Sequence, residues 1–158
     1  MKQVLQIQQV GGEYWIPTIY ETKIRQMRTR SFELGVPARE NSPEILHTLL
    51  GIELKVGRKR LACPDLPTAR YLAIFARIGC TEVAVPYDIT LLSSIADDLE
   101  TAWHRTRLVF DDSMREKTVQ AKGRSWANLV KAMRDEISKI GAGTKMPMFN
   151  RSTKQRSN

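Results

Sequence analysis

Residues 52–87 constrain the fold more than any other part of this 158-residue chain. The apolar run "IELKV" has the composition of a strand, and "RLAC" is a second short strand pattern after Gly57. The segment "TARYLAIFARIG" shows helical spacing, is capped by Asp65 or Thr68 and ends at a glycine. The run "TEVAVPY" that follows is rich in valine, as the buried strands of parallel sheets are. A strand, a helix and a strand in this order predict a crossover unit with a right-handed connection.

The segments that precede residue 52 carry three further patterns. Apolar residues alternate in "VLQIQQVGGEYWIPTIY", which predicts a hairpin turning at Gly11 and Gly12. Residues 21–35 are basic and have weak helical spacing that ends at Gly35. The pair Ser42-Pro43 predicts the start of a short helix that ends at Gly51.

Two long amphipathic helices are predicted in the second half of the chain. The first begins at the N-cap Asp88 and keeps an apolar stripe for about six turns. The pair Ser113 and Glu116 has the spacing of a capping box, so we expect a further helix to start there, with an interruption at Gly123 and an end at Gly141. Trp103 and Trp126 lie on the apolar stripes of these helices, which places both in the core.

These elements predict an α/β or α+β fold. A small mixed sheet would combine the N-terminal hairpin with the strand-helix-strand unit, and the two long C-terminal helices would cover it. A chain of this length fits one domain, which we assign to residues 1–141. Residues 142–158 carry cations and no acid, so we expect a flexible basic tail that is too polar to fold by itself.

Composition excludes several classes of protein. No apolar stretch approaches the roughly 18 residues of a membrane-spanning helix, and the N-terminus lacks the pattern of a signal peptide, so we expect a cytoplasmic protein with no membrane partner. Cys63 and Cys80 lie outside any zinc-binding spacing and are expected to be buried thiols without a disulfide. The chain has no phosphate-cradling glycine motif, so we expect no nucleotide cofactor.

The positive charge is confined to one part of the chain. Residues 1–100 hold 12 basic and 12 acidic residues, whereas residues 101–158 hold 13 basic and 5 acidic residues and so carry the whole net charge of +8. Such an asymmetry is typical of a chain that contacts a polyanion with one part. It is also compatible with charge that only keeps helix faces in solution.

We therefore expect a nucleic-acid-binding protein without catalytic activity, an accessory subunit of a nucleoprotein complex that also contacts other proteins. The sequence does not distinguish RNA from DNA as the ligand. The contacts to phosphate are expected from a basic hairpin tip, the helices and the tail: Arg58, Lys59, Arg60, Arg105, Arg107, Lys122, Arg124, Lys145, Arg151, Lys154 and Arg156. His104 would join them if its end of the helix lies on the ligand. A third possibility is an adaptor that binds only proteins.

One alternative assigns a reaction to the chain. Glu53 and Lys55 stand two apart on the predicted "IELKV" strand and so point to the same face. This spacing, with the helix and the valine-rich strand that follow, resembles the second half of the PD-(D/E)XK nucleases. The resemblance implies that Glu53 binds Mg²⁺ as a cofactor and that Lys55 orients or activates water. The family also places an Asp before this strand, and no Asp precedes Asp65 here, so a solvent-facing strand with cross-strand ion pairs is the main interpretation.

Overall fold

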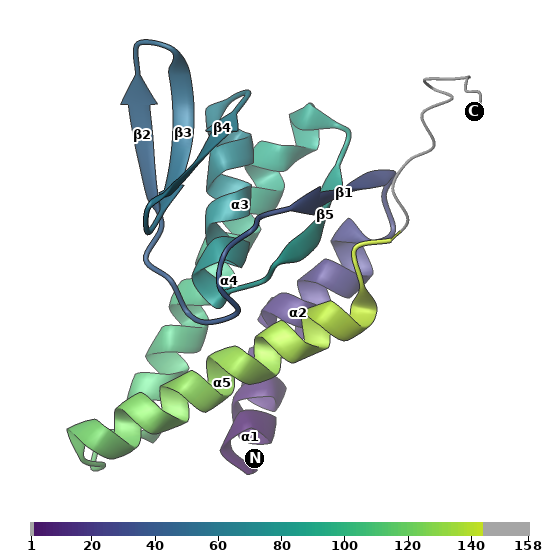
Figure 1. The fold of residues 1–158 in the computed structure, drawn as a ribbon. Helices are drawn as coiled ribbons and strands as arrows, with labels where there is room; N and C mark the ends of the chain where they lie inside the picture. The colour runs from purple at the N-terminus through teal and green to yellow at the C-terminus, as the bar shows by residue number, and fades with distance from the viewer. Residues whose placement is uncertain (1, 144–158) are drawn as a thin grey trace.

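The fold is α+β, as predicted, with two small antiparallel sheets packed against helices (Figure 1). The computed structural model describes residues 2–143. The predicted tail cations Lys145, Arg151, Lys154 and Arg156 lie outside the described residues. None of the described helices is both long enough and apolar enough to cross a membrane.

The N-terminal segment is helical, so the predicted hairpin is wrong. It forms α1 (Lys2–Gly11), the 3₁₀ turn η1 (Gly12–Tyr14), α2 (Ile16–Ile19) and the π-helical turn η2 (Tyr20–Ile24). Val4 and Ile7 are buried while Leu5 and Val10 are exposed, which fits one face of a helix with a period of about 3.6 residues and not the alternation of a strand. The same residues fit both periods over a short stretch, and packing against the long helices selects the helix.

The three-stranded sheet joins β2 (Glu44–Thr48), β3 (Gly51–Val56) and β4 (Lys59–Cys63), each antiparallel to its neighbour. The predicted strands at "IELKV" and "RLAC" are confirmed as β3 and β4. The helix predicted from Ser42 to Gly51 is wrong, because β2 pairs along its whole length with β3. The residues of the predicted apolar stripe do not share one face. Ile45 packs against the core, whereas Leu49 and Leu50 are exposed at the turn between β2 and β3.

The second sheet has two strands, β1 (Thr29–Glu33) and β5 (Glu82–Pro86), paired antiparallel. The valine-rich strand is confirmed as β5, but its place in a parallel crossover unit is wrong, because β4 and β5 belong to different sheets. The weak helix predicted over residues 21–35 is limited to η2 and gives way to β1. Gly35, with φ of 64°, follows that strand instead of ending a helix.

Three longer helices complete the fold, and the predictions for them hold except at the start of the last helix and at Gly123. Asp65 caps α3 (Leu66–Ile78), whose C-cap is Gly79, and Asp88 caps α4 (Ile89–Ser113). Ser113 ends α4 instead of starting a helix; Thr118 caps α5 (Val119–Ile140), accepting a hydrogen bond from the Ala121 N–H at 3.1 Å. The predicted interruption at Gly123 is wrong, because α5 runs through it without a break; the predicted end at Gly141 is confirmed.

The helices α4 and α5 meet at the turn formed by residues 114–118 and diverge from it (Figure 1). The helix α3 packs on α4, and the guanidinium of Arg70 fixes the two together by bonding Asp97 at 2.5 Å and Glu100 at 2.7 Å. Hydrogen bonds to Glu100 and Asp97 raise the pKa of Arg70. Cys63 and Cys80 are buried and unbridged, as predicted.

Two tyrosines close the edge of β5 that β1 does not cover. The N–H of Ala84 donates to the Tyr20 hydroxyl at 2.9 Å, and its carbonyl accepts from the Tyr71 hydroxyl at 2.5 Å. The Tyr20 hydroxyl in turn donates to the carbonyl of Gly141 at 2.8 Å. Both rings pack against Phe75, and burial raises the pKa of both hydroxyls. The strand is thereby joined to η2, α3 and the end of α5 without a third strand.

We predict that Tyr20→Phe and Tyr71→Phe each lower the free energy of unfolding by about 1–3 kcal/mol, because each leaves one buried backbone group of Ala84 without a partner. Urea denaturation measures the change. Tyr87→Phe is the matched control, since its side chain is 43% exposed, and should stay within about 0.5 kcal/mol of the wild type. Equal effects from Tyr20→Phe and Tyr87→Phe would contradict the role given to the buried hydroxyls.

Candidate nucleic-acid interface

The basic tip is a two-residue turn between β3 and β4. Gly57 adopts φ of 62°, which allows the tight turn, and Arg58 beside it is exposed. The Lys59 side chain lies over Gly35, where an added Cβ would collide with its Nζ. Arg60 points to the opposite face of the sheet and pairs with Glu53 at 3.2 Å. Of the three predicted cations, Arg58 and Lys59 therefore keep their charge available, while that of Arg60 is partly neutralised.

Glu53 and Lys55 share the outer face of the three-stranded sheet, as their spacing predicted. Lys55 stands opposite Glu44 on one side and Arg60 on the other, and Glu53 bonds Arg60. This is a solvent-facing network of alternating charges, in which Glu53 has a cation as its partner. Among residues 2–143, no group of three or more His, Cys, Asp and Glu side chains is arranged to hold a metal ion.

A cluster of arginine and tryptophan joins the three long helices. The Arg77 guanidinium of α3 stands over the Trp103 ring of α4, with its Cζ 5.7 Å from the ring centre. Trp103 meets Trp126 of α5 edge to face at 5.4 Å, and Arg107 stands over Trp126 at 4.4 Å. The Trp126 indole donates a hydrogen bond to Glu40 at 2.9 Å. We call Arg77, Trp103, Arg107 and Trp126 the Arg-Trp cluster.

The loop at residues 35–41 connects the basic tip to the Arg-Trp cluster. It starts at Gly35 under Lys59 and ends where Asn41 donates its N–H to the Arg77 carbonyl at 3.0 Å. Within it, Glu40 reaches Trp126 and Arg39 is exposed. The chain thus places five cations along one stretch of surface, which we call the basic loop surface: Arg39, Arg58, Lys59, Arg77 and Arg107.

Arginines held on aromatic rings differ from arginines in ion pairs. A ring neutralises no charge, and it fixes the planar guanidinium, so less side-chain entropy is lost when the guanidinium bonds an anion. Arg77 makes no ion pair with any residue that the structure describes, whereas Arg107 also pairs with Asp111 at 3.4 Å. Such groups suit phosphate, because the N–H edge of a guanidinium bonds two phosphate oxygens at once.

Of the other predicted cations in the helices, Arg105 and Arg124 lie apart from the basic loop surface. Arg105 stands over Tyr14 at 4.0 Å, on the side of α4 that faces the N-terminal helices. It points away from Arg107, because two residues turn a helix by about 200°. Arg124 is exposed, and by the same geometry it points away from Trp126. Lys122 is half-buried one turn before Trp126.

Sequence analysis missed Arg77 and Arg39 in this surface, and it also left out Arg28 and Arg30. The last two both stand over the Tyr87 ring, at 5.1 and 5.8 Å, at the end of β1 and β5 away from the cluster. No spacing in the sequence relates residues 77, 103 and 126, which come together only where three helices cross. The four-residue step from Trp103 to Arg107 is the one visible signal, since it places both on one side of α4.

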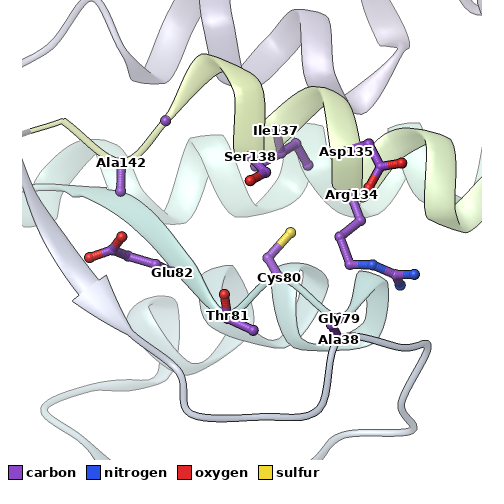
Figure 2. A pocket seen from close by; sticks show the side chains of 11 residues that line it. Ala38, Gly79, Cys80, Thr81, Glu82, Arg134, Asp135, Ile137, Ser138 and Ala142 are labelled. Atoms are coloured by element: carbon purple, nitrogen blue, oxygen red, sulfur yellow. The ribbon is translucent and has the colours of Figure 1, made fainter.

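Two hollows of the surface differ in their chemistry. A cleft of about 430 Å³ lies between the start of β2 and the facing sides of α3 and α4, and Arg77, Trp103 and His104 line it. A second hollow of about 250 Å³ lies between the α3–β5 turn and α5 (Figure 2). Glu82 and Asp135 line the second, and its arginine, Arg134, already donates to the Ile78 carbonyl at 2.9 Å. The first hollow is therefore the better match for an anion.

No family model, no curated protein and no solved structure matches the chain. Any function proposed for it therefore depends on the residues and the geometry described above.

The second hollow contains a thiol whose proton should affect stability. Figure 2 shows the sulfur of Cys80 directed toward α5, and burial raises the pKa of this thiol from 9.0 to about 12. The folded chain therefore keeps a proton that the unfolded chain releases, so the free energy of unfolding should fall as the pH rises from 9.0 toward 12. Urea denaturation across this range should show a smaller fall for Cys80→Ala than for the wild type.

Ser138→Ala is the control for that measurement, because it removes a side chain from the same hollow that does not ionise in this range. It should keep the wild-type slope. Parallel curves for the wild type and Cys80→Ala would show that the Cys80 proton does not contribute. Tyr20 and Tyr71 act in the same direction, so some alkaline loss should persist in every variant.

Proposed function

We propose that this protein binds nucleic acid through the basic loop surface, without catalysing a reaction on it. The proposal includes a place in the cytoplasm and in a larger complex with other proteins. The observation that carries it is the Arg-Trp cluster next to the basic tip. Arg77 and Arg107 are held on tryptophan rings, and the loop at residues 35–41 continues from them to Arg58 and Lys59.

The distribution of charge along the fold supports a phosphate backbone as the ligand. The basic loop surface carries five cations, and two acids lie beside it: Asp111 pairs with Arg107, and Glu40 accepts a hydrogen bond from the Trp126 indole, so the cations remain in excess. A polyanion that follows this surface would replace counterions at several points, so its affinity would fall steeply with salt. The tail adds four cations in sequence and would strengthen the same contact.

We predict that labelled RNA or DNA binds at low salt and that the affinity falls between about 50 and about 200 mM salt. The double variant Arg58→Gln, Lys59→Gln should weaken binding. It should also reduce the slope of log K against log salt by about 0.7–0.9 for each phosphate that the variant no longer neutralises. Fluorescence anisotropy measures both quantities, and the exposed turn makes a folding defect from these changes unexpected.

The matched control is the double variant Arg115→Gln, Lys131→Gln, which removes the same charge from cations already paired with Asp112 and Asp135. It should bind like the wild type. Equal losses in the two double variants would show a general charge effect and contradict a defined surface. The oligonucleotide should also stay intact with Mg²⁺ present; cleavage that Glu53→Ala abolishes would support the nuclease instead.

A further inference from the structure

The cleft between β2 and α4 has an apolar wall on one side and an aromatic one on the other. Pro43 and Ile45, at the start of β2, face Trp103 of α4 across a space of about 430 Å³. Ile74 of α3 lies between them. Trp103 is half-buried, so part of its ring is open to this space. A flat, mostly apolar ring is the kind of group that such a slot accommodates, and the volume is within the range of small-ligand sites.

The rim of the cleft is cationic. Arg77 stands over the Trp103 ring and has no carboxylate partner among residues 2–143, and His104 is exposed on the next position of α4. The remaining charges at the rim cancel, because Arg70 bonds Glu100 at 2.7 Å. A ligand that combines a flat ring with a nearby negative charge would therefore satisfy both the wall and the rim.

We propose that this cleft holds one unstacked base of a single-stranded nucleic acid, with the base against Trp103 and its phosphate at Arg77. This inference rests on the proposed function and deepens it, because it specifies single strands as the preferred ligand. A base in a duplex is paired and stacked and cannot enter the cleft, so a duplex is limited to phosphate contacts such as those of Arg58 and Lys59. Stacking of one base on an aromatic ring corresponds to a preference of about 5- to 150-fold.

Tryptophan fluorescence tests the inference directly. Trp15 is fully buried and Trp126 is nearly so, which leaves Trp103 as the indole that a ligand can reach. A single-stranded oligonucleotide should quench the emission of the wild type and bind about 5- to 150-fold more tightly than a duplex of the same length and salt. In Trp103→Phe the quenching should disappear while the circular dichroism spectrum stays that of a folded chain.

A second variant fills the cleft without removing a charge or a ring. Ala73 of α3 lines the cleft, and Ala73→Leu should abolish the preference for single strands while duplex binding stays unchanged. Ala127→Leu is the matched control, since Ala127 is exposed on α5 and outside the cleft. It should keep both the preference and the quenching.

The outcomes separate this inference from the proposed function. Equal binding of single strands and duplexes, with no quenching and no effect of Ala73→Leu, overturns the base-binding cleft and leaves the phosphate-binding surface standing. The cleft would then be open to another occupant, such as a protein segment added beside β2. Failure of the wild type to bind any nucleic acid at low salt overturns both.

Discussion

The closure of β5 by two tyrosine hydroxyls is the interaction on which the rest of the fold depends. A two-stranded sheet leaves one edge of β5 uncovered, and unpaired backbone groups in a buried strand are costly. Tyr20 and Tyr71 supply the missing donor and acceptor at Ala84, and Tyr20 also reaches Gly141. One strand therefore fixes the positions of η2, α3 and α5 relative to one another.

The candidate interface follows from that arrangement. Arg77 lies at the end of α3 and Trp126 lies on α5, so their distance depends on how the two helices are held around β5. Trp103 of α4 contacts both of them, and Arg107 of α4 stands over Trp126. Because the Arg77 guanidinium is fixed by the Trp103 ring and makes no ion pair with a described carboxylate, the cluster keeps positive charge in a defined geometry. The basic tip, by contrast, supplies charge from an exposed turn.

The sequence could predict the elements whose signals are local. Asp65, Asp88 and Gly79 are caps that act within one turn, and the apolar stripes of α3, α4 and α5 are long enough to define their period. The segment of β2 could not be predicted in this way. The spacing of Ile45 and Leu49 fits a helix, and the decisive interaction is pairing with β3. Gly11 and Gly12 led to the wrong prediction of a hairpin for a similar reason, because glycine is common both at the ends of helices and in hairpin turns.

Only part of the candidate site could be predicted, again because only signals that are local in the sequence can be recognised from it. The cations of the tip are adjacent in sequence, so Arg58 and Lys59 could be found as a group. Arg105 and Arg107 were grouped by proximity along the chain, but the helix turns them to different sides, toward Tyr14 and Trp126. Arg77 becomes part of the surface only because α3 packs on α4 and because the loop that carries Glu40 is held to Trp126 by a hydrogen bond.

Arginine footprinting tests the basic loop surface most directly. The protein would be treated with phenylglyoxal with and without a saturating single-stranded oligonucleotide, and the modified residues would be identified by mass spectrometry. We expect the oligonucleotide to protect Arg39, Arg58 and Arg107 while Arg115, an exposed arginine after the end of α4, reacts as it does in the free protein. Equal protection of Arg115, or unprotected Arg58 and Arg107 in a saturated complex, would contradict the surface that we assign.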